Sequence, residues 1–198
     1  MAEDTEKNET ASPHLESPTL LKSLPPTDPR VLREITAAQL GNIHYAAIGR
    51  VAAAGALFES TVDQHLFEIA GLGIEAGICF TGQMIGPRPR IDAFIALVRL
   101  KGLNGRKWNE KLEEIAKGAT GLAEQRNRAV HDVWDVSHPE KPQRIEATAR
   151  RTVRSTLVHV PTTELLDLEV AILRFGERFD EMASQITDEL FSSPDRVP

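Results

Sequence analysis

The residues with the clearest chemical potential in this sequence are an arginine and a histidine five positions apart, Arg126 and His131. An imidazole exchanges protons near neutral pH, and a guanidinium offers a fixed fork of donors to phosphate oxygens. Such a pair could cleave RNA without a metal ion, because RNA carries its own nucleophile in the 2′-hydroxyl. Asn127 lies four residues before His131 on the same helical face and could orient the imidazole. Arg126, Asn127 and His131 are therefore the candidate catalytic residues.

The helix expected to carry these residues runs from Arg106 to Trp134. Its apolar stripe follows a near-heptad spacing and consists of Trp108, Leu112, Ile115, Ala119, Leu122, Ala129 and Val133. Arg126 falls on that stripe, so its charge needs a partner or must open onto a cleft. Glu59 and Asp63 are the expected supporting partners, because they lie on a long helix whose small residues would allow close packing.

The relative orientation of Arg126 and His131 limits how they could act together. On a straight helix, side chains five residues apart diverge by about 140°. The two groups meet at one phosphate only if the helix ends near His131, or if two copies bring their segments together across a dimer axis. A homodimer is therefore part of the predicted function. A purely structural role stays open, with Arg126 in an ion pair and His131 interacting with the helix dipole.

The elements that must position these residues are mostly helices. Apolar spacings of three and four predict helices over 42–70, 74–85, 91–100, 106–134 and from about 162 to 190. Alternating β-branched residues predict a β-hairpin over 144–160, although 146–150 could also be helical. The predicted fold class is mainly α: an antiparallel helical bundle with a β-hairpin insert before the last helix.

Some of these elements carry further expectations. The first long helix should bury a stripe that consists of Ile43, Ala47, Val51, Ala54, Phe58, Val62, Leu66 and Ile69. The helix over 74–85 is apolar enough to be buried, so Cys79 within it is expected to be a buried, inert thiol. The last helix follows Pro161, and a threonine there can cap its first turn.

Composition limits the domain organisation. A chain of 198 residues that is 41% hydrophobic has enough length for one core. Residues 1–29 are rich in Glu, Ser, Thr, Lys and Pro, which predicts a disordered arm before a helical domain at 30–190, and a flexible tail is expected at 191–198. A single cysteine, an acidic start and the lack of a long apolar run predict a cytoplasmic protein without a membrane segment.

Charge and motifs argue against several functional classes. The formal net charge of −6 argues against a basic footprint over the whole protein, so RNA contacts are expected locally. The candidate RNA-binding residues are Arg128 and, around the hairpin, Arg150, Arg151 and Arg154. The hairpin arginines could instead protect exposed strand edges. The sequence has no phosphate-binding glycine loop, dinucleotide fingerprint or Glu-x-x-His pair, so neither a cofactor nor a metal ion is expected.

The segment Glu-Gln-Arg-Asn-Arg-Ala-Val-His-Asp-Val-Trp at 124–134 resembles the Arg-x(4–6)-His signature of the HEPN superfamily in its Arg-Asn form. The resemblance covers roughly 42–135 and the final helix, and the hairpin looks like a family-specific insert. It implies a helical bundle and, as in many HEPN proteins, a metal-independent endoribonuclease whose paired protomers form one cleft. His131 would then be the acid and base group, and Arg126 would bind the phosphate.

The resemblance leaves two functional classes open. One is an endoribonuclease that acts as a toxin or as a stress or defence effector, with a neutralising protein partner. The alternative is a non-catalytic HEPN-like helical module that binds a protein partner or RNA.

Overall fold

The computed structural model describes residues 29–103, 105–138, 140–150 and 152–192, so nearly all of the predicted arm and tail lies outside the described residues. The chain divides into two units, residues 1–36 and 37–198, and the core, the sheet and the candidate site lie in the second. The helices are α1 (Pro29–Ala70), α2 (Ile74–Thr81), α3 (Pro87–Leu100), α4 (Arg106–His131) and α5 (Thr162–Phe191). The strands are β1 (Val133–Asp135), β2 (Gln143–Arg150) and β3 (Thr152–His159). The predicted fold class is confirmed.

The core forms where the apolar stripes of the long helices meet. Phe179 on α5 packs edge-on against Phe58 of α1, with ring centroids 5.9 Å apart, and against Phe94 of α3, at 5.2 Å. Gly118 lets α4 approach α5 closely, because a Cβ there would lie 2.6 Å from the Phe175 ring. The stripe predicted on α1 is buried except for Ile43, which is exposed. Periodicity therefore identified the faces that make the core.

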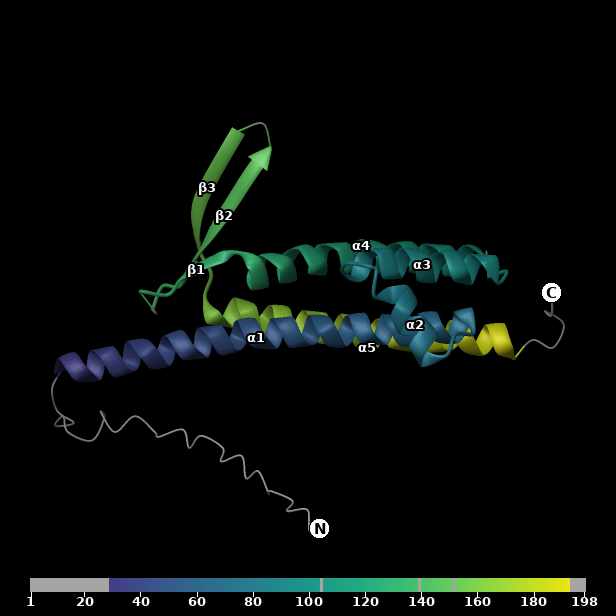
Figure 1. Ribbon diagram of the computed structural model, residues 1–198, viewed down its shortest axis with the longest axis horizontal. Coiled ribbons are helices and arrows are strands. Elements are labelled where there is room, and N and C mark those ends of the chain that lie inside the picture. Colours follow the sequence, from purple (N-terminus) through teal and green to yellow (C-terminus); the bar gives the residue numbers. More distant parts are fainter. Residues whose placement is uncertain (1–28, 104, 139, 151, 193–198) are drawn as a thin grey trace, which may run out of the picture. The chain divides into compact units, whose positions relative to one another are not determined.

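The predicted hairpin is confirmed, and it belongs to a sheet with a third strand (Figure 1). β2 and β3 pair antiparallel, and the segment 146–150 is strand rather than helix. β1 was expected to be the end of α4. It pairs instead with β2, so that Val133 lies opposite Ile145 and Asp135 opposite Gln143. The backbone groups of Val133–Asp135 therefore form hydrogen bonds with β2. In a longer α4 they would have formed hydrogen bonds within the helix.

The prediction of a buried helix over 74–85 is wrong. α2 ends at Thr81 and buries only Gly77 and Thr81, while Cys79 is exposed. The helix is held by one narrow face: a Cβ on Gly77 would lie 2.5 Å from the Phe67 ring, so the backbone of α2 lies directly against that side chain. An apolar segment is buried only where another element covers it, and the sequence does not state which faces are covered.

In the described part of the chain, none of the helices combines the length and apolarity that a membrane span requires.

Candidate functional site

Arg126 lies half-buried on α4, where its side chain crosses α1 at Gly55. A Cβ on Gly55 would come within 3.1 Å of the Arg126 Nε, so the glycine leaves the space that the arginine occupies. The Nη1 of Arg126 donates a hydrogen bond to Asn127 Oδ1 at 3.0 Å. Its Nε is buried without a hydrogen-bond partner among the described residues. Arg126 therefore carries a positive charge that no described carboxylate meets.

The predicted partners of Arg126 bind another arginine. Arg90 on α3 pairs through Nε with Asp63 Oδ1 at 2.8 Å and through Nη1 with Glu59 Oε2 at 3.3 Å. Arg90 also donates to the carbonyl oxygens of Met84, at 2.7 Å, and Gly86, at 2.8 Å. The expected pairing of Arg126 with Glu59 and Asp63 is thus wrong, because α3 places a second guanidinium closer to both acids. In the sequence Arg90 follows a Gly-Pro turn and looks like a surface residue, so no local signal indicated its role.

A small pocket, here called the Arg126 pocket, lies beside the arginine and is lined by residues that include Glu59, Pro87, Arg126 and Asn127. Its volume is about 20 Å³, which is close to the space one water molecule needs. A nucleotide cannot enter it. Any phosphate that Arg126 binds must lie over its mouth, where a ligand or a second protein surface can cover it.

His131 is the last residue of α4, exposed, and has no hydrogen bond or ion pair within the described structure. It is not among the residues that line the Arg126 pocket. The helix is continuous from Arg126 to His131, so their side chains diverge by about 140°. Asn127 does not bond to His131 as predicted, because its amide oxygen accepts the Arg126 guanidinium. Asn127 is therefore placed to orient the arginine.

The predicted RNA-binding arginines are only partly described. Arg128 is exposed, and its Nη1 binds Glu146 Oε1 at 3.1 Å. Arg144 also binds Glu146, and this hydrogen bond, followed by the charge of Arg128, holds the pKa of the Glu146 carboxyl below its usual range. Arg128 thus has a carboxylate partner, unlike Arg126. The side chains of Arg150, Arg151 and Arg154 lie outside the described residues.

The end of α4 beside His131 is held by Trp134 and His44. The indole Nε1 of Trp134 donates to the carbonyl oxygen of Ala129 at 2.8 Å, and the ring packs against the core. Trp134 therefore covers the core, as expected from its amphipathic ring. His44 on α1 packs edge-on against this indole at 4.7 Å, and its Nδ1 is 3.0 Å from Thr162 Oγ1. Thr162 is the first residue of α5 and makes this contact instead of the predicted cap.

Lowering the pH is expected to destabilise the fold through His44. The side chain is 1% exposed, and burial, followed by the charge of His159, lowers its pKa below the usual 6.5. The unfolded chain therefore takes up this proton first, so stability that is present above about pH 6.5 is lost as the pH falls toward the lowered pKa. Thermal melts from about pH 7.5 to 5 should show a steeper fall in Tm for the wild type than for His44→Gln. Parallel curves would contradict this assignment.

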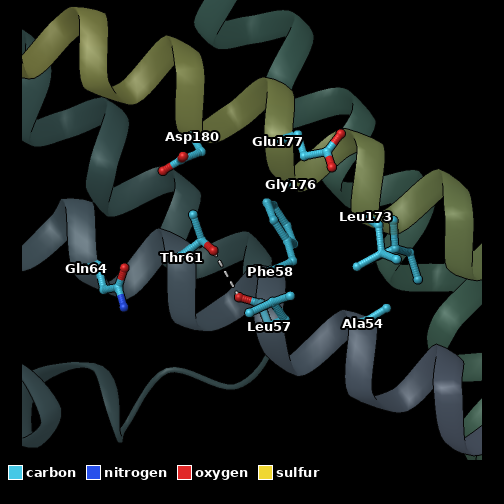
Figure 2. Close-up of a pocket in the computed structure, with 10 residues that line it drawn as sticks. Ala54, Leu57, Phe58, Thr61, Gln64, Leu173, Gly176, Glu177 and Asp180 are labelled. Atoms are coloured by element: carbon cyan, nitrogen blue, oxygen red, sulfur yellow. Dashed lines mark hydrogen bonds between the residues drawn. The ribbon is translucent and has the colours of Figure 1, made fainter.

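A groove between α1 and α5 offers more space but the wrong charge (Figure 2). It has a volume of about 330 Å³ and is lined by Leu57, Thr61 and Gln64 from one helix and by Glu177 and Asp180 from the other. No Lys, Arg or His lines it, and its two carboxylates would repel a phosphate. This groove is therefore not a site for RNA.

Among the residues with described positions, no group of three or more His, Cys, Asp and Glu side chains is arranged to hold a metal ion. Comparisons with protein-family models, with curated proteins and with solved structures find no match to this chain.

Proposed function

We propose that this chain is a HEPN-like, metal-independent endoribonuclease that acts as a homodimer. The observation that carries the proposal is the half-buried Arg126 guanidinium, which has no carboxylate partner in the described structure although acids lie nearby. Partly buried charges in proteins are normally paired, so an unpaired guanidinium held by an asparagine favours an anionic ligand. A phosphodiester is the anion on which an unpaired histidine, such as His131, could also act.

The proposed reaction uses the RNA itself as the nucleophile. The 2′-hydroxyl oxygen attacks the adjacent phosphorus while the bond to the leaving 5′-oxygen breaks, which yields a 2′,3′-cyclic phosphate and a free 5′-hydroxyl. His131 accepts the proton of the 2′-hydroxyl, and the leaving 5′-oxygen takes a proton from the imidazolium that results. Arg126 binds the oxygens of the phosphorane as their charge grows, and Asn127 holds the guanidinium.

Two copies would supply the two groups. Within one chain Arg126 and His131 point in different directions from α4, so the site combines Arg126 of one subunit with His131 of the partner subunit. By its resemblance to the HEPN superfamily, we extend the proposal to a cytoplasmic toxin or a stress or defence effector that a protein partner neutralises.

The test is digestion of varied single-stranded RNAs by the full purified chain in EDTA. Arg126→Ala and His131→Ala should each slow cleavage by at least about 100-fold. Arg178→Ala and His138→Ala are matched controls, because both side chains are exposed and lie outside the proposed site, and they should cut at the wild-type rate. RNA carrying 2′-O-methyl groups should stay intact, since its nucleophile is blocked.

The alternative is a non-catalytic helical module that binds a protein partner or RNA. One observation favours it: in a single chain the Arg126 pocket does not include His131. The same digestion separates the two functions. A wild-type chain that leaves every RNA intact, or an Arg126→Ala chain that cuts at the wild-type rate, would rule out the nuclease.

A further inference from the structure

α2 and the turn after it expose large apolar side chains to solvent. Ile74 is 73% exposed, Ile78 58%, Phe80 47% and Ile85 94%. Together with Cys79 these residues form what we call the α2 surface. Glu75 is the one charged residue in the segment 74–85. Ile74 and Ile78 lie one turn apart on one flank of α2 and Phe80 lies on the opposite flank, so apolar side chains are exposed on both flanks of the helix; such exposure in a chain whose net charge is −6 indicates a protein interface.

The α2 surface is held in place from beneath, so its exposure does not result from a loose segment. Gly77 sits directly on the Phe67 ring, and Thr81 Oγ1 donates to Asp63 Oδ2 at 3.1 Å. Arg90 binds the carbonyl oxygens of Met84 and Gly86, which anchors the turn that carries Ile85. A surface that is already ordered loses little conformational entropy on binding.

We infer that the α2 surface joins two copies of this chain. Two copies of an acidic protein repel each other over most of their surface, but the α2 surface is almost free of charge. About a two-fold axis, antiparallel packing would set Glu75, near the start of one α2, against the segment that follows the other α2, where the exposed Arg88 lies. Ala76 and Cys79 are small and exposed on the outer side of the helix, which permits close approach of a second helix.

The α2 surface is linked to the proposed site by the short segment from Ile85 to Pro87, and this part of the inference rests on the proposed function. Pro87, two residues after Ile85, lines the Arg126 pocket together with Arg126 and Asn127. A second copy seated on the α2 surface would lie close to Pro87 and so beside that pocket. Pairing would cover the mouth and bring the second α4, with His131 of the partner subunit, to the phosphate.

Sedimentation velocity and crosslinking of the full chain test the inference. Cys79 is the single cysteine and lies on the α2 surface, so a short bismaleimide should join two chains through it. The wild type should sediment as a dimer and crosslink. Ile78→Glu and Ile85→Glu should each weaken dimerisation by roughly 30-fold or more. Leu100→Glu is the matched control, because Leu100 is 79% exposed at the end of α3, outside the α2 surface, and this variant should dimerise like the wild type.

Far-UV circular dichroism spectra like that of the wild type would show that the two glutamate variants fold, while their Tm should fall toward the value of the monomer because dimerisation no longer stabilises the chain. A monomeric wild type, dimerisation of Ile78→Glu and Ile85→Glu at wild-type strength, or no crosslink through Cys79 would each overturn the inference. Cleavage of RNA by monomeric Ile85→Glu at the wild-type rate would also overturn the inference, because one chain would then hold the whole site. The proposed nuclease activity would not be affected by that result. A dimer through the α2 surface that cuts no RNA would support the interface and refute the proposed function.

Discussion

A mixture of Arg126→Ala and His131→Ala chains is expected to regain about a quarter of the wild-type rate of RNA cleavage, although each variant alone loses at least about 100-fold. The two side chains leave α4 in different directions, so each site would take one group from each chain. Random exchange of subunits makes half of the dimers mixed. Each mixed dimer holds one site with both groups and one site with neither, which gives about a quarter of the original sites.

Co-expression of the two variants with different tags ensures that mixed dimers form and can be purified. The control pairs Arg126→Ala with a chain that carries both Arg126→Ala and His131→Ala, and this combination should stay inactive because no site can have Arg126. Purified mixed dimers of the single variants that show no recovery would mean that both groups act within one chain. The proposal that each site is shared between two chains would then be wrong. The roles of Arg126 and His131 would still be supported by the loss of activity in each single variant.

Replacing Arg90 with alanine is expected to lower the free energy of unfolding by about 3 kcal/mol or more. Glu59 and Asp63 are about four-fifths buried, and both depend on the Arg90 guanidinium for a counter-charge. Without it, two carboxylates stay close together with little access to water, and the carbonyl oxygens of Met84 and Gly86 lose their donor. Urea denaturation followed by circular dichroism measures this difference.

Arg88 provides the matched control for Arg90, because it lies two residues earlier on α3, is 72% exposed and makes only a long contact of 3.9 Å with Asp92. Arg88→Ala should change the free energy of unfolding by no more than about 0.5 kcal/mol. Arg90→Lys should fall between the two, since an ammonium keeps the charge but lacks the fork of donors that reaches acids and carbonyls together. Equal losses for Arg88→Ala and Arg90→Ala would show that the buried network contributes little.

The sequence determined the long helices, the stripes that make the core and the hairpin. These features depend on the order of residues along one element: a spacing of three and four sets which side of a helix is apolar, and alternation does the same for a strand. The same local logic found Arg126, because a charge on an apolar stripe stands out without knowledge of the fold. The position of His131 at the end of its helix was also anticipated, within three residues of the expected end at Trp134.

Only the tertiary structure decided which side chains meet. Which arginine pairs with Glu59 and Asp63 depends on where α3 packs. The structure pairs them with Arg90, whereas the sequence had predicted Arg126 as their partner. The exposure of α2 depends on the contact of Gly77 with Phe67, and β1 exists because β2 lies beside it. Such contacts join residues that are distant along the chain, and their energies depend on distance and burial in three dimensions, which no local pattern encodes.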